Sequence, residues 1–303
     1  TTGGAVVIKT KRPVLNQSSV QVEGMYGKYD TAEVKGAINL PIVEDKVALR
    51  VVAGYGRSDG YIRNSEPYGP VLNFSGTPTS FDGLSGKPDG RHIGGEKVWN
   101  ARVKLLVEPS DNLSSLFQYD ILRDTSPTPA TINITPKGDM SYAFNLLGFA
   151  SSGNSPIKSG ALTDRKDTLM DESKGSLVRV DGYYNNTNIT TDAGTITNVI
   201  GLRRQRTKLS NTYGGEVAFD AAGKPLSLFD SVRSDKRRTF QEELRFASNL
   251  EGPFNFVVGG FYQKDKIDFC SAAPRPSAPT ATTRKACASA RTSAVRARRS
   301  RSG

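Results

Sequence analysis

Strict alternation of apolar and polar side chains, sustained over long segments, is the feature of this sequence that most constrains its fold. Successive side chains of a β-strand point to opposite faces, so each such segment predicts a strand with one apolar face. Five of them lie between residues 18 and 122, with apolar residues on one parity at 20–26, 34–40, 47–55, 99–107 and 113–121. No charged residue falls on that parity in any of the five. A basic residue on a lipid-facing wall costs about 2–4 kcal/mol at mid-bilayer, so this pattern suits a membrane wall.

Four more segments read as strands, which gives about nine strands and no predicted helix: 175–184, 195–204, 239–248 and 254–263. The chain has no run of 18 apolar residues, so a transmembrane helix is not predicted. The first residue is a threonine and no signal peptide precedes it, so the N-terminus is interpreted as a cut.

Strand length and the order of connections favour a membrane barrel over a soluble β-sandwich, which would also bury one face of each strand. The first five strands run close to nine or ten residues, whereas soluble strands average about five or six. Tight turns alternate with long loops rich in Gly, Pro and Ser: turns at 41–46, 108–112 and 249–253, loops at 57–95, 124–173 and 205–238. Short turns at one rim and long loops at the other are typical of outer-membrane barrels.

Basic charge is concentrated in the last part of the chain. The net charge is +11, but residues 271–303 contribute eight of these charges and contain no acid. This segment has no Leu, Ile, Phe or Tyr, so it cannot bury apolar surface and is expected to be disordered. Its composition, dominated by Ala, Arg, Pro and Ser, favours the hypothesis of a frameshift over that of a natural basic arm. Both cysteines, Cys270 and Cys287, lie at or beyond this boundary, so the body of the chain is not expected to rely on disulfides.

The opening TTGGAVVIKTKRP (1–13) resembles the junction between plug and barrel in TonB-dependent outer-membrane receptors. In that family a Thr-Gly-Gly step precedes a short apolar strand and a basic-Pro exit, and Gly3, Gly4 and Pro13 stand at the matching positions here. Glycine lets the backbone pass close to the wall, and Pro13 marks a break before the next strand. The stretches 41–64, 240–248 and 254–263 are similar to family patterns too, in the family's order.

The resemblance predicts three parts of the chain. Residues 1–13 are expected to end the plug and form the junction, residues 14–269 to form a partial antiparallel transmembrane β-barrel, and residues 270–303 to form the disordered tail. A family barrel has about 22 strands, so nine strands are less than half of one. The plug and the segment that recruits TonB are expected to precede this chain.

Membership of this family implies active uptake of a scarce solute across the outer membrane of a Gram-negative bacterium, with an iron–siderophore as the leading candidate. Outer-membrane lipid, TonB and the solute are the implied partners, and no cofactor or nucleic acid is expected. Loop 57–95 mixes aromatic and basic residues, which suit a polar, often anionic ligand. The ligand-facing candidates in it are Tyr61, Arg63, Tyr68, Phe74 and Arg91.

The sequence has too few suitable residues for catalysis or for a histidine metal site. His92 is the only histidine, so a catalytic triad or a histidine metal site lacks its parts, and no enzyme is predicted. The acidic loop cluster at 164–172 lacks the spacing of a calcium loop. Two alternatives stay open: a passive porin, which has no plug and gives residues 1–13 no role, and a soluble glycan-binding β-sandwich. A nucleic-acid-binding protein would depend wholly on the basic tail.

Overall fold

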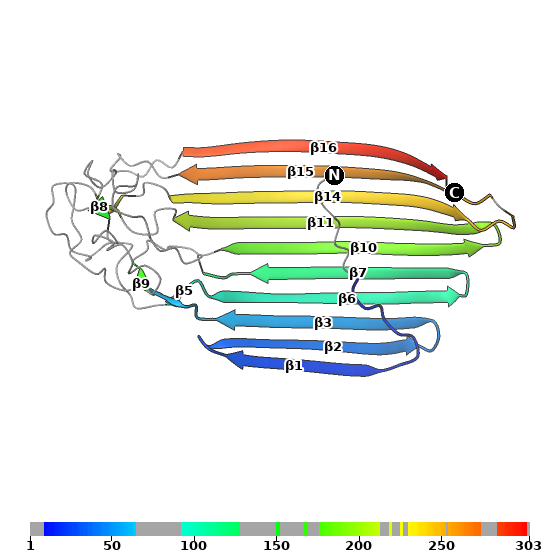
Figure 1. The fold of residues 1–303 in the computed structure, drawn as a ribbon, viewed down its shortest axis with the longest axis horizontal. Helices are drawn as coiled ribbons and strands as arrows, with labels where there is room; N and C mark the ends of the chain where they lie inside the picture. Colours follow the sequence, from blue (N-terminus) through cyan, green and yellow to red (C-terminus); the bar gives the residue numbers. More distant parts are fainter. Residues whose placement is uncertain are drawn as a thin grey trace.

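A single large sheet dominates the computed structural model (Figure 1). The structure describes residues 9–64, 92–127, 150–151, 167–168, 176–212, 218–219, 225–226, 230–252, 254–273 and 284–301. Ten antiparallel strands pair in the order β1-β2-β3-β6-β7-β10-β11-β14-β15-β16. Their bounds are β1 Ser19–Gly27, β2 Thr31–Val43, β3 Val47–Ser58, β6 Glu96–Ser110, β7 Leu113–Asp124, β10 Leu177–Thr191, β11 Gly194–Thr212, β14 Asp230–Ser248, β15 Phe256–Ala273 and β16 Arg284–Arg301.

All nine strands predicted from the sequence are confirmed, each paired with its neighbour in chain order. The sheet remains open within the described residues, with β1 and β16 as its two edges. This matches the prediction of a partial antiparallel barrel wall. The described residues contain no helix, and so none that is long and apolar enough to cross a membrane.

Short turns gather at one rim of the sheet. They join β2 to β3, β6 to β7, β10 to β11 and β14 to β15. Backbone hydrogen bonds tie neighbouring turns together: Glu108 N donates to Lys46 O at 2.7 Å, Thr190 N to Asn112 O at 2.8 Å, and Asn249 N to Ala193 O at 2.9 Å. Three of these turns were predicted from the sequence. The turn between β10 and β11 was not, because Thr191 and its neighbours continue a polar run without a Pro or an Asn-Gly signal.

The turn between β10 and β11 depends on Gly194. Its φ is 149°, and a Cβ at this position would lie 2.2 Å from the carbonyl oxygen of Ala247. We expect Gly194→Ala to destabilise the folded sheet by about 1–3 kcal/mol, the usual cost of a strained backbone position. Gly260→Ala is the matched control, because nothing lies within 4 Å of its Cβ position. Urea unfolding of the chain refolded in detergent micelles measures both, and equal midpoints would contradict the prediction.

Several strands are longer than the sequence predicts. β11 and β14 each have 19 residues, and they take in 205–212 and 230–238, which were assigned to a long loop. The ladder continues there through Arg206 opposite Lys236 and Thr207 opposite Asp235. Both faces of the strands are polar in this part, so alternation disappears while backbone pairing goes on. The loop boundaries predicted at 205–238 were therefore wrong.

The C-terminal tail also differs from its prediction. β15 continues to Ala273, and the backbone of Arg284–Arg301 forms β16, which pairs along β15. Disorder was expected from the lack of apolar residues, but an antiparallel ladder needs only backbone groups, and β15 otherwise offers an unpaired edge. Cys270 lies opposite Cys287 in this register, and Cys270 is disulfide-bonded. The frameshift remains a hypothesis.

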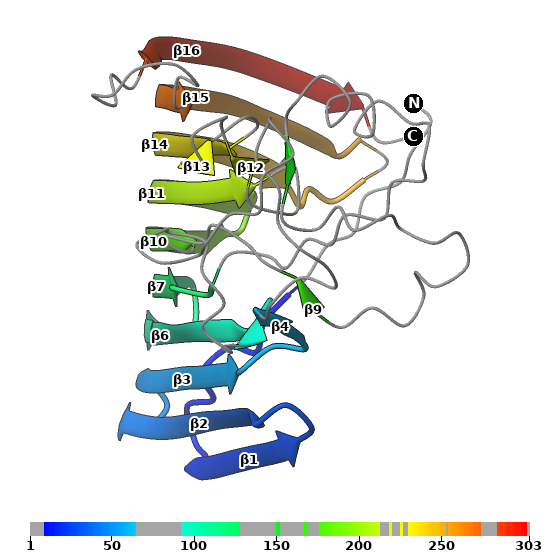
Figure 2. The same ribbon diagram turned by 90° about the vertical axis from the view of Figure 1, so that its left-hand side faces the viewer.

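At the other rim, which we call the loop rim, short strands stand beside the main sheet. β4 (Ile62–Asn64) pairs with β5 (His92–Ile93) and, in parallel, with β9 (Asp167–Thr168). β8 (Ala150–Ser151), β12 (Ala218–Phe219) and β13 (Pro225–Leu226) form a second small sheet. Ile62 and Ile93 are buried, so the first small sheet has a packed centre. Figure 2 shows these elements against the single layer of long strands.

The long sheet has two unlike faces. Its outer face carries the apolar parity, and many large side chains there are exposed, among them Val34, Trp99, Phe117, Tyr183 and Leu244. Only five apolar residues are buried in the described parts of the chain: Ala48, Ile62, Ile93, Leu106 and Val180. A sheet of this size with so small a core has its apolar surface turned outward.

On strands β3 to β15 the outward charges lie towards the loop rim, with one exception, and their boundary runs diagonally. The first outward charges on β3 and β6 are Arg57 and Lys97, which pair in one row. On β7 the first outward charge is Arg123, one row closer to the turns than Arg57 and Lys97. On β10, β11 and β14 the first outward charge lies two rows closer to the turns, and on β15 it lies three rows closer. Glu242 is the exception within the apolar zone, where its carboxylate accepts a hydrogen bond from Asn198 at 3.4 Å.

Candidate functional site on the inner face

Polar side chains line the inner face of the sheet in continuous rows. One row crosses eight strands from β2 to β15, because each residue in it pairs directly with the next: Asn39, Arg50, Lys104, Gln118, Tyr184, Gly201, Gln241 and Gln263. Apart from Gly201, every member can donate a hydrogen bond. The alternation that makes the outer face apolar therefore gives the inner face a band of donors.

The segment Lys9–Gln17 lies across this inner face and is held by two buried side chains. The ammonium of Lys104, which is only 4% exposed, donates to Thr10 Oγ1 at 2.6 Å, Lys11 O at 3.0 Å and Thr10 O at 3.2 Å. Figure 1 shows the dark-blue segment passing over the middle of the sheet before it enters β1. The bonds span 93 and 94 positions of sequence, so they fix the segment by tertiary contact rather than by local structure.

Asn39 forms the second attachment. It is fully buried, accepts a hydrogen bond from Val14 N at 2.9 Å, and donates to Val14 O at 2.9 Å and Gln17 O at 2.6 Å. A side-chain amide that pairs with both polar groups of one residue imitates a neighbouring strand, so Val14 is bound as if it were in the sheet. Pro13, which lies between the two attachments, is buried.

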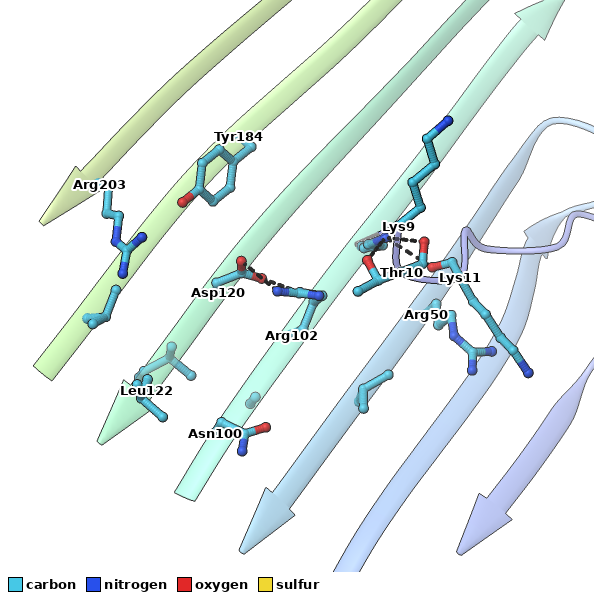
Figure 3. A pocket seen from close by; sticks show the side chains of 15 residues that line it. Lys9, Thr10, Lys11, Arg50, Asn100, Arg102, Asp120, Leu122, Tyr184 and Arg203 are labelled. Atoms are coloured by element: carbon cyan, nitrogen blue, oxygen red, sulfur yellow. Dashed lines mark hydrogen bonds and ion pairs between the residues drawn. The ribbon is translucent and has the colours of Figure 1, made fainter. Parts of the chain in front are cut away.

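A hollow of about 640 Å³ lies beside the attached segment, between it and strands β3 to β11 (Figure 3). Arg102 and Asp120 form a bidentate pair in it, with Nε to Oδ1 at 2.6 Å and Nη2 to Oδ2 at 3.0 Å. Gln118 donates to the same carboxylate at 2.9 Å. This pairing neutralises the one acidic group of the lining, which leaves the remaining basic groups in excess.

Two of those basic groups, Arg50 and Arg203, form no ion pair with any described residue. Figure 3 shows Arg203 and Tyr184 near each other on neighbouring strands, across the hollow from Lys9, Thr10 and Lys11. A second hollow of about 330 Å³ shares Tyr184 and Arg203 and continues over β11, β14 and β15, where Gln205, Arg237, Thr239, Gln241 and Gln263 line it. The lining is basic and rich in amides and hydroxyls.

This arrangement can bind or conduct a polar anion. Guanidinium groups recognise carboxylate and phosphate through paired hydrogen bonds, and amides add direction. The described residues contain no cluster of His, Cys, Asp or Glu that could hold a metal ion. The Arg, Gln, Tyr and Thr side chains that line the two hollows are suited to such binding.

Three of the residues that the sequence predicted for the site lie within the described parts of the chain: Pro13, Tyr61 and Arg63. Tyr61 lies at the loop rim, where it is exposed and its ring contacts Tyr29 with centroids 6.5 Å apart. The backbone of Arg63 is part of β4. Gly3, Gly4, Tyr68, Phe74 and Arg91 lie outside the described residues, and Pro13 belongs to the attached segment. Of the loop candidates, only Tyr61 is described with its side chain, and it does not line the inner hollow.

Sequence reasoning missed the inner-face residues that the structure brings together, chiefly Asn39, Arg102, Lys104 and Arg203. A signal was present, because each lies on the polar parity of a predicted strand. The sequence did not indicate that these residues lie at a similar level along their strands, because this depends on the register of eight paired strands.

Comparison with known proteins supports the fold. No protein-family model matches the sequence, and no curated protein matches it. Among solved structures, the ferric yersiniabactin uptake receptor FyuA of Yersinia pestis is similar, with a TM-score of 0.60 and 16% identity over 94% of this chain and 36% of that one. The siderophore receptor PirA of Acinetobacter baumannii has a TM-score of 0.49 and 12% identity over 86% and 31% of the two chains. The ferric enterobactin receptor of Pseudomonas aeruginosa has a TM-score of 0.49 and 13% identity over 93% and 36%.

The chain thus spans about a third of the length of the solved receptors it matches. Only the first likeness is close enough in shape to support an argument, and at 16% identity it concerns the fold alone. It agrees with the resemblance drawn from the alternating strands and from residues 1–13. What the likeness shows is the fold: the chain has the fold of part of a ferric yersiniabactin uptake receptor.

Proposed function

We propose that this chain is the plug–barrel junction and part of the barrel wall of a TonB-dependent receptor, which transports a scarce anionic solute across the outer membrane of a Gram-negative bacterium. The observation that carries the proposal is the contrast between the two faces of one long sheet. From β3 to β15 the outer face is mainly apolar, and Glu242 is its one charge on the turn side of a diagonal boundary, whereas the inner face is polar and basic. The protein is a receptor for transport, in line with its solved neighbours, and not an enzyme.

The diagonal boundary supports a membrane wall quantitatively. From β3 to β15 it descends three rows over six steps between strands. Three rows are six residues, or about 20 Å along a strand, and six steps across the sheet are about 29 Å. A horizontal membrane surface that cuts the sheet in this way corresponds to a strand tilt of about 35°, within the range of outer-membrane barrels.

The attached segment supports the assignment of residues 1–13. It crosses the inner face of the sheet, which is the side where a plug would lie inside a closed barrel. Lys104 then fastens the end of the plug to the wall at Thr10 and Lys11, and Asn39 fastens the residues that follow it, Val14 and Gln17.

An iron–siderophore is the solute we favour. The basic lining of the inner hollow, with Arg50 and Arg203 unpaired among the described residues, suits an anionic, oxygen-rich complex. FyuA, the neighbour with the higher TM-score, is an uptake receptor for ferric yersiniabactin, which supports an iron complex as the solute here. TonB would supply the force for transport.

Disrupting the gene that encodes this chain tests the proposal. We expect the disrupted strain to lose uptake of ⁵⁵Fe from one ferric siderophore out of a panel, while uptake of the others continues. An uncoupler that abolishes the proton gradient should stop the same uptake in the intact strain. Uptake that depends on the gene but resists the uncoupler would identify a passive porin instead. Uptake that is unchanged for the whole panel, together with recovery of the protein in the soluble fraction, would favour the soluble sandwich.

A further inference from the structure

A second basic cluster lies on the opposite face of the sheet from the proposed solute path. We define it as the outer basic patch: Arg179, Arg204, Arg206, Lys236, Arg238, Lys264 and Lys266. It occupies β10, β11, β14 and β15 just beyond the charge boundary. Alternation fixes its orientation, because Arg203, Thr239 and Gln263 line the inner hollow, and these patch residues have the opposite parity on the same strands.

Like charges face each other directly in this patch. Arg204 is opposite Arg238, which is opposite Lys266. In the row above, Arg179 is opposite Arg206, which is opposite Lys236. Such cross-strand pairs destabilise an isolated sheet, so the arrangement makes physical sense if an anion lies against it.

The patch has little internal compensation. None of its seven residues forms an ion pair or hydrogen bond with another described side chain. Two carboxylates share this part of the outer face, Asp181 and Asp268. Asp181 is already paired with Arg123 at 2.7 Å, and it accepts a hydrogen bond from Tyr119 at 3.1 Å. The outer basic patch therefore keeps a large positive excess.

The height of the patch identifies its partner. On β10, β11 and β14 the next row on the turn side is apolar and aromatic, with Tyr183 opposite Leu202 and Leu202 opposite Phe240, while on β15 the same row holds the patch residue Lys264. Tyr119 and Tyr183 stack with ring centroids 4.8 Å apart. Aromatic rings on barrels mark the edge of the hydrocarbon layer. The two full rows of basic residues lie about 7 and 14 Å farther along the strands, or about 6 and 11 Å higher after tilt, which is the level of the lipid headgroups.

We propose that the outer basic patch binds the phosphate groups of lipid headgroups in the leaflet at the loop rim. Clustered guanidinium groups match phosphate in charge and hydrogen-bonding geometry. The inference rests on the proposed membrane wall but not on transport. It assigns the outer face of β10–β15 a lipid-binding role that is separate from the solute path on the inner face.

A comparison of lipid binding by matched variants tests the proposal. The full chain is refolded in neutral detergent micelles with phosphatidic acid and phosphatidylcholine, and native mass spectrometry counts the lipid molecules that stay bound. We expect R204Q/R238Q to reduce retained phosphatidic acid at least five-fold. R233Q/R245Q is the control, since it removes the same charge from inner positions of β14 where both arginine side chains are about half exposed.

Each outcome either supports or overturns the proposed lipid binding. Equal losses in the two variants would mean that net charge alone attracts the lipid, and no loss in either would mean that the patch does not bind it; both overturn the proposal. Displacement by a ten-fold excess of inorganic phosphate would overturn the lipid assignment in favour of a free anion. Circular dichroism of both variants checks that the strands have formed. Quenching of Trp99 by brominated lipid tests membrane insertion separately, so failure of the membrane wall can be told apart from failure of the patch.

Discussion

Replacing Lys104 with methionine should release the segment Lys9–Gln17 from the inner face and expose the Lys11–Arg12 bond to trypsin. The ammonium of Lys104 holds the carbonyl oxygens of Thr10 and Lys11, and the latter belongs to the bond that trypsin would cut. A hydrogen bond to a charged group contributes about 1.5–3 kcal/mol, so losing even one should speed cleavage at this bond roughly 10- to 100-fold. Peptide mass spectrometry of timed digests in detergent micelles gives the rate.

Lys97→Met is the control for this prediction. Lys97 lies on the same strand, but its side chain is exposed on the outer face. The K97M variant should be cleaved at Lys11–Arg12 as fast as the unmodified chain. The urea midpoint of the sheet should change little in K104M, because the substitution also removes the cost of burying a charge. If cleavage in K104M is no faster than in K97M, Lys104 does not hold the segment.

Asn39→Leu should have the second large effect. Leucine is similar in size but leaves Val14 N, Val14 O and Gln17 O without their partner. Each backbone group that loses its hydrogen bond while buried costs about 1–3 kcal/mol, so the segment should detach rather than stay in place. Hydrogen exchange of the peptide that contains Val14 should rise at least about ten-fold, since protection falls by this factor for each 1.4 kcal/mol.

Two other variants make the Asn39 result specific. Asn100→Leu places the same apolar side chain on the inner face of β6, where Asn100 lines the hollow and is exposed, so exchange at Val14 should not change. Asn39→Asp keeps the acceptor for Val14 N but turns the donor towards Val14 O and Gln17 O into an acceptor. Hydrogen exchange at Val14 in this variant should be faster than in the unmodified chain and slower than in N39L. Unchanged exchange in N39L would show that Asn39 is not an attachment point.

The sequence predicted the strands well because alternation is a local property. Val103 and Lys104 differ in face simply because they are neighbours in a strand. The same logic failed where both faces become polar, and so the upper parts of β11 and β14 around Arg206 were read as loop. In the tail, composition indicated disorder, but backbone groups alone can pair with an open edge such as that of β15.

The candidate site depends on contacts that the sequence could not reveal. Lys104 meets Thr10 across 94 positions, and Asn39 meets Val14 across 25. Both residues were visible as polar members of a strand, but their burial comes from a segment that folds back over them. The outer basic patch was hidden for a related reason: Arg204, Arg238 and Lys266 become neighbours only through the register of three strands.

The fluorescence of Trp99 tests the central claim, that the outer face of the sheet lies against hydrocarbon. Trp99 is the chain's only tryptophan, it is exposed on the outer face, and it pairs across strands with Tyr55. We expect brominated acyl chains to quench its emission strongly after reconstitution into vesicles, and iodide in the water to quench it little. Strong quenching by iodide together with no quenching by brominated lipid would place Trp99 in water and contradict the membrane wall.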